Sequence, residues 1–144
     1  MIVQMRNCVR MAIYLLDTNH ASPLITPSHP LRHRVITEIA AGATFAICVP
    51  MVTELIFGIG LLPRAVANRA AWAQIQPLFP CYLPDETDAV HAAELQIALR
   101  RQGRQLATVD ALIAALALRY GLVLLTTDKD FDAVPELRIE NWLR

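Results

Sequence analysis

The chain has 144 residues, of which 55% are hydrophobic and 18% are charged, and its 13 basic and 13 acidic residues cancel. This length suits one domain with a proper core, and zero net charge argues against binding nucleic acid through a polycationic surface. No apolar run reaches the roughly 18 residues that a membrane span needs, so we expect no membrane contact. Cys8, Cys48 and Cys81 form no Cys-x-x-Cys motif, which favours reduced thiols in a cytoplasmic protein.

The first residues differ from the rest of the chain. Residues 1–10 show no hydrophobic periodicity and lack the apolar region and cleavage site of a signal peptide. Met11 stands directly before the first apolar run. We therefore expect residues 1–11 to be an N-terminal extension, with either Met1 or Met11 as the true start, and residues 12–144 to form the domain.

Apolar runs and helical patterns alternate along that domain. In chain order, the first half is predicted to contain a strand at 12–16, a proline-rich loop at 22–30, a helix at 31–41, a strand at 44–49 and helices at 52–61 and 64–75. The second half is predicted to contain a short strand at 78–83, a long helix that ends at 101, a helix at 108–120, and strands at 122–126 and 138–142. Asp85, Glu86 or Thr87 is expected to cap the long helix, and Thr108 the helix that follows it. This alternation is typical of an α/β protein with a parallel sheet and helices on both faces.

Four acidic residues lie near the ends of predicted strands or the start of a helix. Asp17 and Asp128 follow strands directly, and Glu54 lies in the first turns of the helix after the second strand. The carboxyl ends of parallel strands meet at one edge of the sheet, where α/β proteins bind ligands, so these three should share that edge. Asp110 opens an apolar helix and joins them only if the preceding segment delivers that helix to the same edge.

Taken singly, each acid has an ordinary explanation as a cap, a partner for a helix dipole or part of a surface turn. Glu54 and Asp110, however, lie inside long apolar segments, and no Lys or Arg stands within four positions of Glu54. Two carboxylates 4 Å apart repel each other by roughly 1 kcal/mol in water and about 4 near a protein surface, so a cluster needs a cation. Oxygen ligands favour one or two Mg²⁺ or Mn²⁺ ions, and phosphodiester hydrolysis is the chemistry that suits them.

The segments around these acids resemble the motifs of the PIN domain, specifically those of VapC-type toxin ribonucleases from type II toxin–antitoxin modules. The resemblance covers nearly the whole chain from Ala12 to Arg144. It rests on four segments in order, namely YLLDTN at 14–19, VTELIFG at 52–58, DALIAALA at 110–117 and LLTTDKDF at 124–131, and on IENW at 139–142. The segment before Asp110 departs from the family, because 106–109 reads LATV where many relatives carry Ile-Gly and an Asn.

The resemblance implies a three-layer α/β/α fold with a mostly parallel central sheet, and a metal-dependent endoribonuclease that uses Mg²⁺ or Mn²⁺. Asp17, Glu54, Asp110 and Asp128 would be its catalytic and metal-binding residues. Asp128 is preferred to Asp130 because it directly follows the strand and fits the family's Thr-x-Asp/Asn pattern. Water would attack the phosphorus and leave 5′-phosphate and 3′-hydroxyl ends, with Thr18 or Thr127 positioning water or phosphate.

The resemblance also implies a homodimer, held inactive by a cognate VapB-type antitoxin. The apolar stretch at 55–62 is either a surface for one of these partners or the core face of a helix. Two alternatives remain: a PIN-like RNA-processing nuclease without an antitoxin, and a catalytically silent PIN-like module that binds RNA or protein. RNA cleavage by the wild type compared with Asp17→Asn tests the silent module, and a small neighbouring gene for a DNA-binding antitoxin would favour the toxin.

Overall fold

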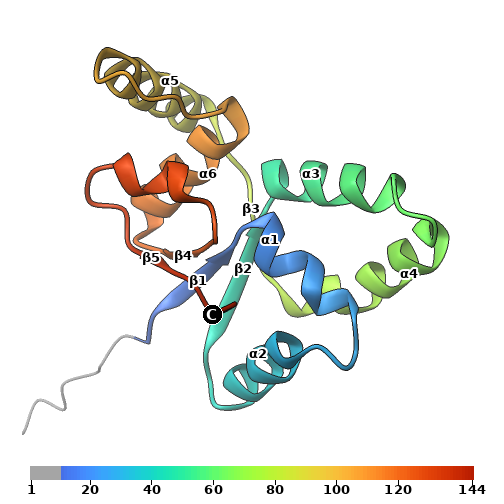
Figure 1. The fold of residues 1–144 in the computed structure, drawn as a ribbon. Helices are drawn as coiled ribbons and strands as arrows, with labels where there is room; N and C mark the ends of the chain where they lie inside the picture. The colour runs from blue at the N-terminus through green and yellow to red at the C-terminus, as the bar shows by residue number, and fades with distance from the viewer. Residues whose placement is uncertain (1–10) are drawn as a thin grey trace, which may run out of the picture.

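The centre of the molecule is a five-stranded sheet in which every neighbouring pair of strands is parallel (Figure 1). The computed structural model describes residues 11–144, so the expected extension lies, apart from Met11, outside the described residues. The strands are β1 (Ile13–Leu16), β2 (Thr44–Cys48), β3 (Cys81–Tyr82), β4 (Val123–Leu125) and β5 (Ile139–Glu140), in the spatial order β3-β2-β1-β4-β5. Leu15 pairs with Ala46 on one side and Leu124 on the other, so β1 lies in the middle.

Helices cover both faces of this sheet, which confirms the predicted three-layer α/β/α fold (Figure 1). One layer contains α1 (Thr18–Ala21), α2 (Pro30–Ala40), α3 (Val49–Gly60) and α4 (Ala65–Ile75), and the other contains α5 (Glu86–Arg101) and α6 (Thr108–Tyr120). Right-handed crossovers explain this division, because connections that move in opposite directions along a sheet place their helices on opposite faces. Among the described residues, no helix is both long enough and apolar enough to cross a membrane.

Four local features differ from the prediction. The loop expected at 22–30 begins with a 3₁₀ turn at Ser22–Ile25, which continues from α1 because Pro23 suits the start of a helical turn. α3 begins at Val49, three residues earlier than predicted, since Pro50 is tolerated in the first turn. Ala107, not Thr108, is the N-cap of α6, and the strand expected at 78–83 keeps two residues because Gln76–Leu78 forms another 3₁₀ turn.

The core fills both sides of the sheet and holds its carboxyl edge in place. Strand side chains with 0% exposure are Leu15, Leu16, Ala46, Ile47, Cys48, Leu124 and Leu125. Burying each large aliphatic side chain stabilises the fold by about 1.5–3 kcal/mol. Alanines on α6, namely Ala111, Ala114, Ala115 and Ala117, are also buried, and their small side chains let this helix lie close to the sheet and to α3.

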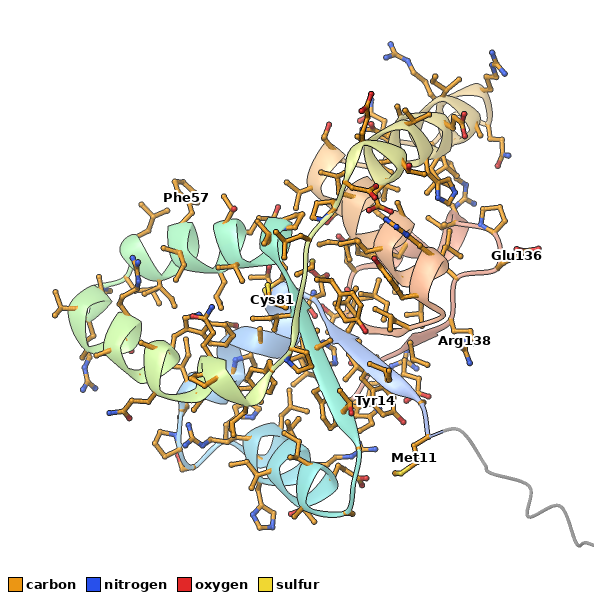
Figure 2. All side chains as sticks on the ribbon, turned by 180° about the vertical axis from the view of Figure 1, so that it is seen from behind. Met11, Tyr14, Phe57, Cys81, Glu136 and Arg138 are labelled. Carbon is orange, nitrogen blue, oxygen red and sulfur yellow. The ribbon has the colours of Figure 1, made fainter. Side chains whose placement is uncertain are left out.

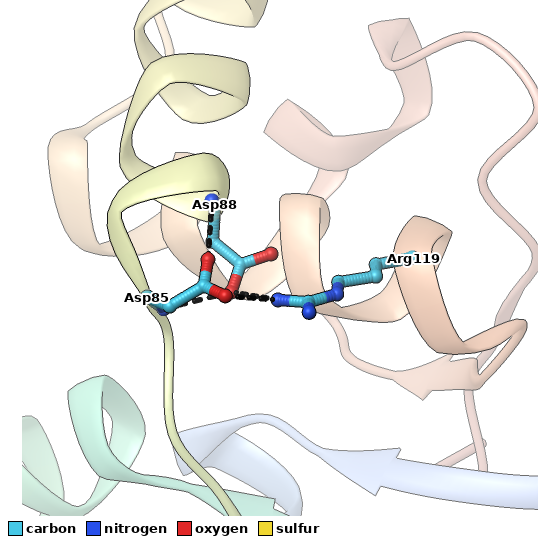
Figure 3. A network of polar contacts seen from close by, with 3 residues as sticks. All are labelled: Asp85, Asp88 and Arg119. Atoms are coloured by element: carbon cyan, nitrogen blue, oxygen red, sulfur yellow. Dashed lines mark hydrogen bonds and ion pairs between the residues drawn. The ribbon is translucent and has the colours of Figure 1, made fainter.

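Polar contacts fix α5 and α6 to each other at both ends, one of which Figure 3 shows. Asp85 and Asp88 form a capping box, in which each carboxylate accepts the other residue's main-chain N–H, at 3.0 and 2.8 Å. Arg119 Nη1 on α6 lies 2.9 Å from both carboxylates. Towards the other end, Gln96 Nε2 donates to the Leu106 carbonyl at 2.9 Å and to Thr108 Oγ1 at 3.3 Å, which locates the start of α6.

Candidate metal centre

The candidate site lies where the strand order reverses, between β1 and β4. From β1 the chain proceeds to β2 and β3 on one side, and it then crosses to β4 on the other. Open α/β sheets bind ligands outside the carboxyl ends of the strands at such a point. Asp17 directly follows β1, and its main-chain N–H donates to the Leu125 carbonyl at the end of β4, at 3.0 Å. Asp128 follows the same end of β4 by three residues.

Three of the four predicted acids meet here. Asp17, Glu54 and Asp110 each offer a carboxylate oxygen that lies within 4.8 Å of the other two. Asp17 is buried with 4% exposure, while the other two side chains are partly exposed to solvent. Glu54 comes from the second turn of α3, which leaves the end of β2 without an intervening loop. The arrangement gathers three carboxylate oxygens close together, with two of the three side chains in contact with solvent.

Asp110 reaches this edge because of the way α6 joins β4. Gly121 ends α6 in the left-handed conformation, with φ of 65°, and β4 begins two residues later. Such a tight connection makes α6 run antiparallel to the strand, so the helix must start at the carboxyl edge. Asp110 lies in the first turn of α6, where the helix dipole favours a negative charge. The start of α6 therefore lies at the carboxyl edge of the sheet, which is the condition under which Asp110 joins the other acids.

Asp128 is outside this group of three oxygens. Its Oδ1 accepts the main-chain N–H of Asp130 at 2.9 Å and so caps the 3₁₀ turn Lys129–Ala133. Its negative charge nevertheless raises the pKa of Asp17, Glu54 and Asp110. The charge of Asp130 raises the pKa of Asp110 less than that of Asp128 does. Of Asp128 and Asp130, Asp128 thus has the stronger electrostatic effect on Asp110. Its role as a metal ligand remains a prediction.

The carboxyl groups of the cluster titrate abnormally. Burial is the largest cause in each case, and it raises the pKa of Asp110 to about 7, with further contributions from Asp17 and Glu54. The pKa of Asp17 is raised by burial although hydrogen bonds from Thr126 and Thr18 oppose the shift, and the pKa of Glu54 is raised by burial and by Asp17. Carboxylates that share a desolvated space in this way suit a divalent cation, which would remove their mutual repulsion.

Sequence reasoning missed two polar residues that orient Asp17. Its Oδ2 accepts the Thr126 hydroxyl at 2.7 Å and Asn19 Nδ2 at 3.2 Å, while Oδ1 accepts the Thr18 main-chain N–H at 2.8 Å. Thr18 Oγ1 donates to Glu54 Oε2 at 3.4 Å. Of the adjacent threonines after β4, Thr126 is buried and Thr127 is exposed, which periodicity alone could not decide. The structure therefore adds the hydroxyl of Thr126 to the candidate site, and the positioning of water or phosphate by Thr18 or Thr127 stays a prediction.

Comparison with known proteins identifies the family to which this fold belongs. The family model for the PIN domain matches residues 14–137. The chain belongs to the PIN domain family. The resemblance found in the motifs is thereby confirmed over residues 14–137.

Individual relatives are VapC proteins or complexes that contain them. The tRNA(fMet)-specific endonuclease VapC of Salmonella typhimurium is 28% identical over 135 residues, covering 92% of this chain and 99% of the relative. A crystal structure of DNA-bound VapBC from Salmonella typhimurium superimposes with a TM-score of 0.77 at 26% identity, covering 92% of this chain and 99% of that one. VapBC2 from Rickettsia felis, bound to a promoter DNA fragment, has the same fold, with a TM-score of 0.79 at 24% identity over 90% and 98% of the two chains.

Proposed function

We propose that this PIN domain is an Mg²⁺-dependent endoribonuclease, the toxin of a VapBC-type toxin–antitoxin module, which hydrolyses RNA phosphodiester bonds in the cytoplasm. The observation that carries the proposal is the convergence of Asp17, Glu54 and Asp110 within 4.8 Å at the strand-order reversal. The endonuclease activity named for the Salmonella relative, which aligns over nearly its whole length, supports the reaction class. The unpaired thiols of Cys48 and Cys81 suit the proposed compartment.

The cluster fits a hard divalent cation, because its ligand atoms are carboxylate oxygens in a partly desolvated space. Asp17, Glu54, Asp110 and Asp128 would hold Mg²⁺, or Mn²⁺ in its place. When bound, the ion would neutralise charge on the RNA phosphate and activate the attacking water. Asp17 Oδ1 accepts one hydrogen bond and so retains a lone pair for the ion, while Thr126 and Asn19 hold Oδ2.

A groove beside the site suits the proposed antitoxin. It has a volume of about 440 Å³ and is lined by residues that include Thr18, Pro23, Leu55 and Leu62. Thr18 both lines the groove and donates to Glu54, so a segment bound there would reach the acids. In the stretch at 55–62, Leu55 and Ile59 are buried and form part of the core, whereas Phe57 and Leu61 are 69% and 72% exposed and are available to a partner.

Cleavage of cellular RNA by the purified protein tests the activity. With Mg²⁺ or Mn²⁺ we expect the wild type to cut RNA and Asp17→Asn to lose at least about 100-fold in rate, because Asp17 is the most buried acid of the cluster. The control is Asp132→Asn, which changes an exposed acid outside the cluster. A wild type as inert as Asp17→Asn would instead favour the silent binding module.

Co-expression with the product of a neighbouring gene tests the proposed antitoxin partner. The product of a small neighbouring reading frame should co-purify with the chain and suppress its RNA cleavage. If that frame is missing, or if its product leaves cleavage unchanged, the toxin assignment gives way to an RNA-processing nuclease.

A further inference from the structure

His20 is a buried histidine with a hydrogen bond at each ring nitrogen. It lies in α1 with 0% exposure. The main-chain N–H of Trp142 donates to Nε2 at 3.0 Å, so Nε2 must be the unprotonated nitrogen. Nδ1 therefore carries the proton and donates it to Asn19 Oδ1 at 2.6 Å. Burial lowers the pKa of His20 to about 4, which is consistent with a neutral ring of this single tautomer.

This tautomer determines which way the Asn19 amide faces, and the amide in turn contacts the acidic site. Its oxygen accepts from His20 Nδ1 and from the Thr127 main-chain N–H at 3.1 Å, so the nitrogen must face the other way. That nitrogen donates to Asp17 Oδ2 and to Thr126 Oγ1, both at 3.2 Å. Reversal of the amide would bring two donors against the His20 and Thr127 N–H groups, which is strongly unfavourable.

The donor at the start of this chain of hydrogen bonds is firmly held. The Trp142 ring packs edge-on against Tyr14 and Phe45, with centroid distances of 5.0 and 5.4 Å. The Arg34 guanidinium lies 3.6 Å from the centroid of the same ring, and the indole N–H donates to Glu140 at 2.7 Å. Tyr14, which is labelled in Figure 2, belongs to β1 of the sheet. The main chain at Trp142 is thereby fixed relative to β1 and β2.

We propose that His20 is a positioning residue, whose Nδ1–H group, through the Asn19 amide, fixes the orientation of Asp17 and Thr126. The inference rests on the proposed role of Asp17 as a metal ligand. Groups that orient a metal ligand without touching the metal change affinity or activity by about 10–100-fold when they are removed. His20 contributes in this indirect way, since its two hydrogen bonds go to Asn19 and Trp142.

Two substitutions of His20 separate its two hydrogen bonds. His20→Asn retains a donor near the position of Nδ1 and loses the contact with Trp142. His20→Gln retains an acceptor near the position of Nε2 and loses the donor to Asn19. We expect His20→Gln to weaken Mn²⁺ binding, measured by calorimetry, by about 10–100-fold and to lower kcat for RNA cleavage with KM unchanged. Rescue by His20→Asn, to within about threefold of the wild type in both measurements, is expected even if both variants lose similar thermal stability.

Asn19→Ala provides a second test, which holds even if His20→Gln does not fold. It leaves the contact between His20 and Trp142 in place and should weaken Mn²⁺ binding at least as much as His20→Gln does. Where both variants fold, the double variant should lose little more than Asn19→Ala alone, because both interrupt the same connection.

The possible results separate this inference from the proposed function. Unchanged Mn²⁺ affinity in Asn19→Ala or His20→Gln, additive losses in the double variant, or equal losses in His20→Gln and His20→Asn would each overturn the positioning role. A wild type that binds no Mn²⁺ and cuts no RNA would overturn the proposed function itself, and the inference with it.

Discussion

The carboxyl group of Asp110 retains its proton up to a pKa of about 7 because it is buried beside Asp17 and Glu54. Its usual value is 3.8, so between these two values the unfolded chain is ionised while the folded protein still binds the proton. The contribution of Asp110 to stability therefore falls as pH rises through this window, and it does not change further above the folded pKa. The site thus stores unfavourable electrostatic energy at neutral pH, which a bound cation would relieve.

We predict that Asp110→Asn stabilises the metal-free protein increasingly as pH rises from about 4 to about 7, because the amide cannot ionise. Thermal unfolding in the presence of a chelator, with the Tm of wild type and variant compared at each pH, measures this effect. At neutral pH, added Mn²⁺ should raise the Tm of the wild type more than that of the variant, since the ion binds only an intact site tightly. A Tm difference that is constant over this pH range would contradict the assigned pKa.

Among the helices, α5 depends on a capping arrangement at its start. Asp88 is buried with 1% exposure, and its carboxylate accepts from both the Asp85 main-chain N–H and Arg119 (Figure 3). Asp88→Ala would leave both donors without this partner and should destabilise the protein by about 1–2 kcal/mol in urea unfolding. Glu86→Ala, an exposed residue in the same turn, is the matched control and should change stability by less than about 0.5 kcal/mol. Equal losses would show that the capping box contributes little.

Elements with strong periodicity were predictable, and short ones were not. The helix at 85–101 was expected with three candidate caps, and the structure selects Asp85 because Asp88, three residues later, completes the box. α1 has four residues, which is too short for any hydrophobic period to appear, and it forms because the Asp17 side chain accepts from Thr18 at its start. Asp110 was left conditional, although a helix that leads straight into a parallel strand has to begin at the carboxyl edge.

For the whole molecule, the class of fold could be read from the sequence but the order of the strands could not. Alternating strands and helices predict a parallel sheet, yet nothing local states that β4 lies beside β1 rather than β3. That order creates the reversal at which Asp17 lies beside the end of β4. Thr126 and Asn19 became visible only there, because their contacts with each other join residues 107 positions apart. The four acids themselves were singled out by their positions near strand ends and helix starts, and the family resemblance then implied Asp110 independently.

The predicted homodimer requires a contact surface, and the outer face of α3 and α4, which carries exposed apolar side chains, is a candidate for it. Phe57, Leu61 and Val66 are 69%, 72% and 87% exposed, and Figure 2 shows Phe57 pointing away from the body of the protein. Exposed apolar groups can mark contact surfaces, and a symmetric dimer buries the same patch on both subunits. This face belongs to the helices that also line the groove assigned to the antitoxin, so both partners would use one layer of the fold.

We predict that Phe57→Glu and Leu61→Glu each convert a dimer into a monomer in light-scattering measurements, because a charge would have to be buried twice across the symmetric contact. Val90→Glu on α5, 54% exposed, is the matched control and should remain dimeric. The Tm of the monomeric variants should depend less on protein concentration than that of the wild type, since dissociation and unfolding are no longer linked. If the Val90 variant dissociates and the Phe57 variant does not, the dimer forms through the opposite layer of the sheet.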